Sequence, residues 1–523
     1  MSRYIILVSL GLTLAAGLGL TALGMAAGYW ITAITLPLCA LGIFDLIQTP
    51  HTLWRNYPLI SHMRWLFEGI RPEIRQYLIE SDADAFPFNR EQRSLVYQRA
   101  KNELQTIPFG TQQDVYAPDY AFFTHSIKVE HVAPEALRVS IGGKDCTQPY
   151  DCSLLNISAM SFGALSGNAI AALNRGAKLG GFAHDTGEGG ISPHHRKYGG
   201  DIIWEIGSGY FGCRTAGGSF DPVQFAEKAQ DPQIKMIEIK LSQGAKPGHG
   251  GMLPGAKVSR EIAETRGVPI GVDCISPASH SAFSTPLELI DFIAQLRSLS
   301  AGKPVGFKLC VGHRREFMAL VKAMRARDTY PDFIVVDGKE GGTGAAPLEF
   351  SNSIGLPLRD GLHFVNMTLI GAGIRDRLKI GASGKIVSGA DMAQAMALGA
   401  DWCNSARGFM FSIGCIQARS CHTNRCPTGV ATQDRWRQAG LDVGDKSQRV
   451  ANFHRNTLHG FAEMVGAMGL KSPTGITRNM LNFREQHLSG TEMPALADGQ
   501  LLGDACPVAY AELWQRADAA SFH

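Results

Sequence analysis

The sequence predicts an α/β protein in which a (β/α)8 TIM barrel follows a pair of N-terminal transmembrane helices. Eight short apolar segments alternate with helical segments over about 250 residues, which is the usual size of such a barrel. Residues 4–44 contain no charged side chain, as is typical of membrane-spanning helices. Three cysteines within residues 414–433, the last followed by a proline, indicate a redox centre in the barrel domain.

The uncharged N-terminal stretch is long enough for two membrane helices of about 20 residues each. We place them at residues 4–23 and 29–47, joined by a turn at residues 24–28. A cleaved signal peptide is the alternative, but the apolar run is longer than the core of a signal and continues through a second span. The pattern therefore favours a transmembrane hairpin.

Basic residues flank this hairpin on one side only. Arg3 precedes the first span, the turn contains no Lys or Arg, and the arginines after the second span are Arg55, Arg64, Arg71 and Arg75. By the positive-inside rule, both ends of the hairpin lie in the cytoplasm. We therefore expect a multi-pass protein of the cell inner membrane whose catalytic domain is cytoplasmic.

The composition excludes some classes of protein. The net charge of +3 is too small and too dispersed to indicate a nucleic-acid-binding protein. The 11 cysteines are odd in number and irregularly spaced, so a disulfide framework is not expected and a reducing compartment is favoured. The 59 glycines suit a protein with many tight turns close to a ligand.

We divide the chain into four segments. Residues 1–50 form the hairpin of two helices, and residues 51–115 form a helical connector with solvated charges and no chemistry of its own. Residues 116–480 form the barrel domain, which includes the cysteine loop 414–433, and residues 481–523 form a C-terminal tail.

The barrel strands are expected to be short and apolar, and each is followed by a polar or glycine-rich loop and then a helix. We predict them at residues 154–157, 181–184, 236–240, 271–275, 305–309, 333–336, 379–382 and 401–405. Active sites of such barrels lie in the loops that follow the strands, so the chemistry should be carried by these loops.

Small residues follow the first two predicted strands. Residues 158–163 read SAMSFG and residues 185–190 read DTGEGG. Small side chains and glycines at these positions would allow a flat ring and its polar edge to approach the backbone.

Cations follow the third and fifth predicted strands. Lys240 ends the third, and Gln243 and Lys246 follow it before a glycine-rich run, which suits an anionic substrate. Lys308 ends the fifth strand and should point into the mouth of the barrel. The alternatives are a solvated pair of loop lysines for Lys240 and Lys246, and a salt bridge at the strand end for Lys308.

Glycines follow the sixth and seventh strands, where barrels commonly bind a phosphate. Gly341, Gly342 and Gly344 lie in the run after the sixth strand, and Gly384 and the pair Ser388–Gly389 come after the seventh. A tight turn without a ligand is the alternative for the first group.

The spacing of Cys415, Cys421 and Cys426 resembles that of thiolates that hold iron–sulfur clusters. A zinc site with a ligand such as His422 and a disulfide between two of the three are the alternatives. Zinc sites favour shorter gaps between cysteines, and a disulfide would need an oxidising compartment.

Several of these stretches together resemble one known family. They are ISAMSFGALS (157–166), TGEGG (186–190), IKLSQGAKPG (239–248), GGTGAAP (341–347), LRDGL (358–362) and the run of three cysteines. In this order, over roughly residues 150–435, they are similar to the FMN-binding synthase region of glutamate synthases.

The resemblance implies an FMN-binding barrel that reduces 2-iminoglutarate, formed from 2-oxoglutarate and ammonia, to L-glutamate. It also implies a [3Fe-4S] cluster, held by the three cysteines, that passes electrons from a ferredoxin-like or membrane donor. The implied catalytic residues are Lys308, Lys240, Gln243 and Glu188, and the implied substrate-binding residues are Gln243, Lys246 and Gly189. The implied FMN-binding residues are Ser158, Ala159, Met160, Ser161, Thr186, Gly187, Glu188, Lys240, Lys308, Gly341, Gly342, Gly344, Gly384, Ser388 and Gly389.

The chain also departs from the family. It has no glutaminase region, so we expect free ammonia or a separate amidotransferase subunit to supply the nitrogen. His249 and Met252 stand where Glu and Gln are expected, beside the implied substrate site. Two further hypotheses therefore stand beside a glutamate synthase-like enzyme: an FMN and iron–sulfur enzyme that acts on another amine or amino acid with a membrane electron partner, and a non-catalytic membrane scaffold.

Overall fold

The computed structural model divides the chain into two compact units, residues 1–86 and residues 87–523. The residues described are 4–83, 85–103, 105–118, 120–483, 496, 500–502 and 506–522. The boundary falls inside the segment predicted as a connector. Each unit has its own packing and is described separately.

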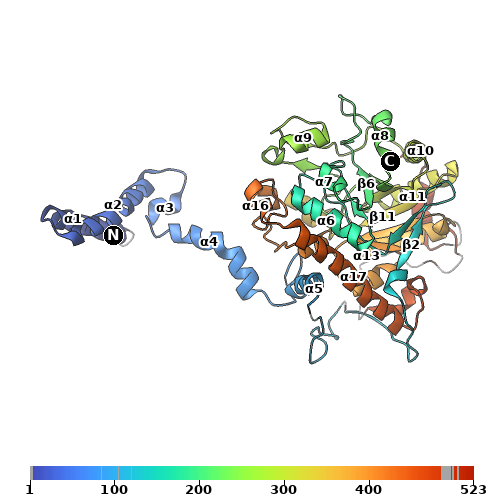
Figure 1. Cartoon of the computed structure of the whole chain (residues 1–523), viewed down its shortest axis with the longest axis horizontal. Coiled ribbons are helices and arrows are strands. Elements are labelled where there is room, and N and C mark those ends of the chain that lie inside the picture. The colour runs from blue at the N-terminus through green and yellow to red at the C-terminus, as the bar shows by residue number, and fades with distance from the viewer. Residues whose placement is uncertain are drawn as a thin grey trace. The chain divides into compact units, whose positions relative to one another are not determined.

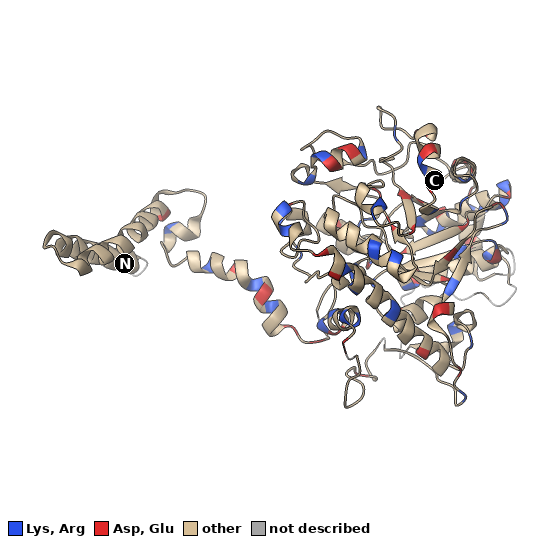
Figure 2. Ribbon diagram, in the orientation of Figure 1, with Lys and Arg blue, Asp and Glu red and all other residues tan. Residues whose placement is uncertain are grey.

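The first unit begins with two long apolar helices, α1 (Ile5–Ala22) and α2 (Ala26–Ile47), which confirms the two predicted helices closely. They pack through glycines: a Cβ atom on Gly28 would lie 2.3 Å from the backbone nitrogen of Thr21. Both helices are long and apolar enough to cross a membrane, and Figure 2 shows them almost without charged residues. The short helix α3 (Thr52–Asn56), helix α4 (His62–Ile74) and a π-helical turn (Arg75–Ile79) complete the unit.

The second unit contains the predicted barrel, a closed ring of eight parallel strands with helices outside it (Figure 1). In ring order the strands are β4 (Leu155–Ile157), β5 (His184–Asp185), β6 (Ile202–Ile206), β7 (Ile234–Lys240), β10 (Val305–Leu309), β11 (Phe333–Asp337), β12 (Lys379–Ser383) and β13 (Trp402–Ser405). The ring closes where Cys403 pairs with Leu155. The strands are buried on both faces, as parallel strands inside a layer of helices must be.

The helices that connect the barrel strands begin at recognisable caps. Ser166 caps α6 (Gly167–Gly180) by accepting a hydrogen bond from the backbone of Ala169, and Thr285 forms a capping box with Glu288 at the start of α10 (Pro286–Leu299). The other helices of the layer are α7 (Pro193–Arg196), α8 (Pro222–Ala229), α11 (Arg314–Arg327), α12 (Leu348–Ser353), α13 (Leu358–Gly371), α14 (Gly389–Ala397) and α15 (Arg407–Ser412).

One predicted strand was wrong and one barrel strand was not predicted. The segment 271–275 contributes only β9 (Cys274–Ile275), which pairs antiparallel with β8 (Met252–Leu253) in an excursion that also carries α9 (Arg260–Arg266). The third barrel strand is β6 instead. Its sequence, IIWEI, contains Glu205, whose carboxylate is buried in the barrel and is 2% exposed. The predicted strand β7 also carries a buried glutamate, Glu238, so Glu205 by itself does not set β6 apart from the strands that were predicted.

Other elements join the ends of the barrel domain. Helix α5 (Arg90–Lys101) packs on α17 (Val443–Ala467), and β1 (Ala121–Phe123) pairs antiparallel with β14 (Leu481–Phe483). The hairpin of β2 (Arg138–Ile141) and β3 (Tyr150–Ser153), helix α16 (Arg435–Ala439) and helix α18 (Val508–Arg516) complete the unit. Helix α18 packs on α11, so part of the predicted tail belongs to the helical layer.

Candidate active site

Two loops at the carboxyl ends of β4 and β5 pack directly against each other. A Cβ atom on Gly187, which has a φ of +63°, would lie 2.7 Å from the backbone nitrogen of Ser161. Arg266 holds the first loop by donating to the carbonyl oxygen of Phe162 at 2.9 Å. The structure thus brings Gly189, implied to bind the substrate, together with these positions implied to bind FMN: Ser158, Ala159, Met160, Ser161, Thr186, Gly187 and Glu188.

A buried ion pair lies beside these loops. The ammonium of Lys240, at the end of β7, is 3.1 Å from Oε2 of Glu188, and the Lys240 side chain is 8% exposed. Burial acts to raise the pKa of Glu188, but Lys240 and other nearby cations lower it overall, so this carboxyl group is ionised at neutral pH. The pair therefore fixes a carboxylate and an ammonium at the mouth of the barrel.

The loop after β7 adds a second cation. Lys246 is 3% exposed, and its ammonium donates to the carbonyl oxygen of Ala345 at 3.2 Å. Burial lowers the pKa of Lys246, although Glu188 acts to raise it. Gln243 is half-buried in the same loop, and its carbonyl oxygen accepts a hydrogen bond from the backbone of Lys246. Lys240 and Lys246 are therefore not the solvated pair of loop lysines that was the alternative, because both are buried.

A histidine that was not predicted from the sequence contacts the backbone of Lys240. Nε2 of His280 lies 2.8 Å from the carbonyl oxygen of Lys240, and its Nδ1 lies 3.1 Å from the hydroxyl of Tyr210. Burial lowers the pKa of His280 to about 4, so the ring is neutral and donates from Nε2. His280 belongs to the loop after the excursion, and nothing in its local sequence indicates this contact.

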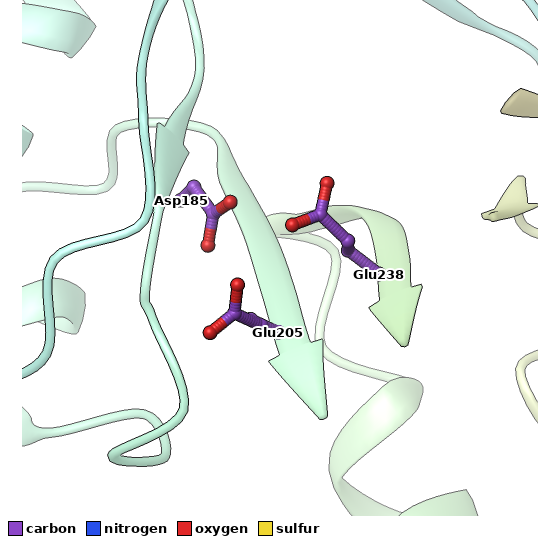
Figure 3. A group of neighbouring side chains, drawn as sticks. All are labelled: Asp185, Glu205 and Glu238. Carbon is purple, nitrogen blue, oxygen red and sulfur yellow. The ribbon is translucent and has the colours of Figure 1, made fainter. Parts of the chain in front are cut away.

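Lys308 points into the barrel, where it meets a group of carboxylates. Its ammonium contacts Oε2 of Glu205 and is 3.1 Å from Oε1 of Glu238. Asp185 completes the group, and the carboxylate oxygens of Asp185, Glu205 and Glu238 lie within 4.8 Å of one another. Figure 3 shows these three side chains converging from β5, β6 and β7. The salt bridge considered for Lys308 is therefore present, inside the barrel.

One ammonium cannot balance three carboxylates in a buried space. Burial, together with Glu205, raises the pKa of Asp185 to about 7 despite the nearby Lys308. Burial likewise raises the pKa of Glu238 well above its usual value. The group therefore retains a proton at neutral pH, and Lys308 takes the position that a bound cation would need.

The glycines after β11 form a tight turn at the other side of the mouth. The backbone N–H of Gly341 donates to Gly338, and Oδ2 of Asp337 accepts from the backbone N–H of Gly244 at 2.6 Å. A Cβ atom on Gly342 would lie 2.8 Å from Nε of Arg407. Gly344 is exposed in the same turn, and Gly384 directly follows β12 with a φ of +153°.

Arg407 is a second residue that sequence reasoning missed. It is the first residue of α15, just beyond the end of β13; it donates to the carbonyl oxygen of Glu340 and stacks 4.7 Å from the centre of the Phe88 ring. Its position was the available signal, because barrels bind phosphate in the loops after the last two strands. Ser388 and Gly389 lie at the start of α14: the hydroxyl of Ser388 donates to Asp391 at 2.8 Å, and Gly389 packs against the backbone of Phe461.

The three cysteines of the loop after α15 line one cavity, and all three thiols are free. Hydrogen bonds from backbone N–H groups, Ala431 foremost, lower the pKa of Cys426 although burial acts to raise it. Such donors stabilise a thiolate. His422, the possible zinc ligand, is exposed on the outside of the loop, and the free thiols exclude the disulfide in this structure.

Lys257, which lies in the excursion after β7, donates hydrogen bonds to this cysteine loop. Its ammonium donates to the carbonyl oxygens of Ala164, Cys421 and Ala431 at 2.9, 3.3 and 3.3 Å. It is 3% exposed. One buried cation thus links the first loop of the barrel mouth to the backbone of the cysteine loop.

The two departures from the expected pattern lie close to Glu188. A Cβ atom on Gly251 would be 2.3 Å from Oε1 of Glu188, so the segment between His249 and Met252 borders that carboxylate. The ring of His249 packs edge-on against Phe350 at 5.1 Å, and Met252 begins β8 with 41% of its surface exposed.

The comparisons with known proteins agree with this arrangement. Residues 126–471 match the model of the family described as the conserved region in glutamate synthase. The chain is 39% identical to the glutamate synthase large subunit-like protein YerD of Bacillus subtilis, over 87% of this chain and 94% of that protein.

Two relatives are archaeal-type enzymes that match over a shorter part. Identity is 36% to the archaeal-type glutamate synthase (NADPH) of Thermotoga maritima and 35% to the archaeal glutamate synthase (NADPH) of Methanocaldococcus jannaschii. Each match covers 65% of this chain and 64% of the relative, which is less than two thirds of the relative's length. With the family region matched over most of the barrel domain, the chain belongs to the glutamate synthase family of oxidoreductases.

Proposed function

We propose that the chain is a membrane-anchored glutamate synthase-like enzyme that reductively aminates 2-oxoglutarate to L-glutamate, with FMN and a [3Fe-4S] cluster as cofactors. The observation that carries the proposal is the buried group of Lys240, Lys246 and Glu188 at the mouth of the barrel. Two buried cations around a single carboxylate suit a dicarboxylate substrate with a nitrogen centre.

The reaction has two steps. Ammonia and 2-oxoglutarate first give 2-iminoglutarate and water; two electrons and two protons then give L-glutamate. In the proposal, Lys240 and Lys246 bind the carboxylates of the substrate and orient its C2 atom. Glu188, ionised and fixed by Lys240, accepts a hydrogen bond from the nitrogen that becomes the amino group.

The residues of the mouth fit FMN. The close packing of Gly187 on Ser161 leaves backbone instead of side chains at the edge where a flat ring would lie, and Arg407 with the glycine turn after β11 suits its phosphate. When bound, FMN supplies a hydride equivalent to the imine carbon. Lys308 provides a permanent positive charge below this site, and the adjacent carboxylates of Asp185 and Glu238 hold a proton.

The cysteine loop fits an iron–sulfur cluster. Cys415, Cys421 and Cys426 line a single cavity, and backbone N–H groups favour the thiolate form of Cys426. A cluster there supplies single electrons for the flavin. The electron donor in the proposal is a ferredoxin-like or membrane-bound protein, and the nitrogen comes from free ammonia or a separate amidotransferase subunit. Helices α1 and α2 anchor the enzyme in the inner membrane with the barrel on the cytoplasmic side.

The test is anaerobic purification in detergent, followed by a visible spectrum and electron paramagnetic resonance on the same sample. We expect a flavin spectrum and a three-iron signal. The Cys421→Ser variant should lose the three-iron signal, whereas Cys403→Ser, which changes a buried cysteine of β13, should keep it. A protein with neither flavin nor iron would contradict the proposal and favour a scaffold.

The substrate is tested by turnover with 2-oxoglutarate and ammonia against other amines. A second candidate, an enzyme of the same type for another amine or amino acid, is favoured by His249 and Met252 beside Glu188. Turnover that requires 2-oxoglutarate and ammonia supports the first candidate. Turnover only with a larger amine supports the second.

A further inference from the structure

Helix α4 has an apolar face that no other described residue of the N-terminal unit covers. Every side chain from Met63 to Glu73 is exposed. The large apolar residues recur at helical spacing on one side, and Leu66 and Phe67 are 60% and 55% exposed. The residues of this apolar face are Met63, Leu66, Phe67, Ile70 and Ile74, and Leu78 follows in the π-helical turn.

A helix of this length needs a surface to stabilise it. Helix α4 has 13 residues, and an isolated helix shorter than about 12–15 residues is marginal in water. An amphipathic helix obtains its stability by burying its apolar face. Another surface must therefore cover the apolar face of α4.

The start of α4 is tied to the last turn of α2. Asp45, which is 0% exposed, accepts a hydrogen bond from the backbone N–H of Leu59 at 2.9 Å. Nε2 of His62 lies 2.9 Å from Oδ1 of the same carboxylate. Leu59 also packs on Gly42, because a Cβ atom there would lie 3.4 Å from the leucine side chain. The first residue of α4 is thus held level with residues 42–45 of α2.

This attachment sets the depth at which α4 begins. The inference rests on the proposed membrane anchor: if α2 crosses the bilayer, its last turn lies where the helix leaves the apolar layer. Trp54 stacks on His62 at 4.5 Å between ring centres, and Trp65 meets Trp54 edge-on at 6.3 Å. Tryptophan is enriched at this level of membrane proteins because its ring is apolar and its N–H is polar.

Arginines follow one edge of the apolar face. Arg64, Arg71 and Arg75 recur at helical spacing, so they lie along one side of α4, where charged and apolar residues interleave (Figure 2). Arg75 also pairs with Glu80 at 3.3 Å. Guanidinium groups beside an apolar face can reach the phosphates of lipid headgroups while the apolar side chains enter the acyl region.

We propose that α4 lies in the cytoplasmic surface of the membrane, with its apolar face among the acyl chains and its arginines at anionic headgroups. The helix then acts as an interfacial support beside the hairpin, not as a solvated connector. The two competing occupants are the barrel unit of the same chain and a second copy of the chain.

The test places a photoreactive benzophenone amino acid in the full-length holoenzyme, reconstituted in vesicles of phosphatidylethanolamine and phosphatidylglycerol. It replaces Phe67 on the apolar face, Glu68 on the polar face as the matched control, or Ile34 on the exposed surface of α2. After illumination, mass spectrometry identifies the adducts. We expect lipid adducts at positions 67 and 34 and none at position 68.

The outcomes test the interfacial position of α4 separately from the membrane anchor formed by α1 and α2. Lipid adducts at position 34 together with adducts at position 67 to residues 87–523 or to a second copy would overturn the interfacial position of α4 and leave the anchor standing. So would the absence of a lipid adduct at position 67. No lipid adduct at position 34 would overturn the anchor itself. Omitting phosphatidylglycerol should lower the yield at position 67 about twofold and leave position 34 unchanged.

Discussion

The ammonium of Lys240 lies 3.1 Å from the carboxylate of Glu188, and both groups are withdrawn from solvent at the mouth of the barrel. Replacing one partner of a buried charge pair leaves the other uncompensated, at a cost of about 2–5 kcal/mol. We therefore expect Lys240→Met to raise the KM for 2-oxoglutarate by about 100-fold. Steady-state kinetics of the purified enzyme measure this.

The matched control is Lys303→Met at the opposite end of the barrel. Lys303 is also buried, but its ammonium donates to the carbonyl oxygens of Ala229 and Asp231. This variant should lose stability and keep the KM. An unchanged KM in Lys240→Met would remove Lys240 from the substrate site.

Arg407 should govern retention of FMN. Its guanidinium packs on Gly342 after β11, and the residue begins α15 just beyond β13, so Arg407→Leu would remove the cation proposed to bind the phosphate. We expect the ratio of flavin to protein after gel filtration to fall about tenfold. Arg359→Leu is the control, because Arg359 bonds Gln394 and stacks on Phe483. Equal flavin content in the two variants would contradict this role.

Lys257 should raise the midpoint potential of the iron–sulfur cluster. Its positive charge is buried against the backbone of Cys421 and Ala431, and a nearby cation favours the reduced, more negative cluster. Lys257→Met should therefore lower the midpoint potential of the cluster by about 50 mV in a redox titration followed by paramagnetic resonance. Lys322→Met, which removes a lysine that donates to Ala517 elsewhere, should leave the potential unchanged. Equal potentials in both variants would argue against a cluster in this loop.

The carboxylate group around Lys308 should make stability depend on pH in an unusual direction. The pKa of Asp185 is raised to about 7 by burial, so between about pH 4 and pH 7 the native state binds a proton that the unfolded state lacks. Its contribution to stability therefore falls as the pH rises through this window, by at most about 1.4 kcal/mol per pH unit. Asp185→Asn cannot titrate, so the melting temperature of this variant relative to the unmodified protein should rise from pH 4 to pH 7.

For Asp221→Asn, the melting temperature relative to the unmodified protein should change with pH in the opposite direction. Hydrogen bonds from Gln224 at the start of α8 lower the pKa of Asp221, so its carboxylate favours the native state at higher pH. The relative melting temperature of Asp221→Asn should fall as the pH rises above the pKa of the native carboxyl group. Parallel curves for Asp185→Asn and the unmodified protein would exclude a proton held at Asp185.

Gly244 should tolerate no side chain. A Cβ atom there would lie 1.6 Å from the carbonyl oxygen of Gly338, and the backbone N–H of Gly244 is bonded to Asp337. Gly244→Ala should therefore displace the loop that carries Lys246 and lower stability by about 1–3 kcal/mol, with loss of turnover. Gly217→Ala, whose Cβ would be 3.9 Å from its nearest neighbour, should change neither quantity. Denaturant titration and the glutamate-forming assay measure the two effects.

The sequence predicted those features that depend on short-range patterns. The predicted strands 236–240 and 305–309 match the ends of β7 and β10, so the sequence located Lys240 and Lys308 at the carboxyl ends of neighbouring barrel strands. Strand β6 was not predicted, although it resembles the predicted β7 in carrying a buried glutamate; what the sequence does not show is that Glu205 and Glu238 share the ammonium of Lys308. His280 and Lys257 escaped for a related reason: each acts on a backbone carbonyl that is distant in sequence, and only the folded chain brings the two together.

The ladder between β1 and β14 sets a limit on the order in which the protein can be completed during synthesis. Ala121 pairs with Phe483 and Phe123 with Leu481, so this ladder joins the segment before the first barrel strand to the segment after the last. Because translation runs from the N-terminus, β1 leaves the ribosome long before its partner exists. β1 therefore cannot form its ladder with β14 until residues 481–483 have left the ribosome. The barrel domain is therefore fastened by residues that are made after its last strand, whereas α1 and α2 are made before its first strand.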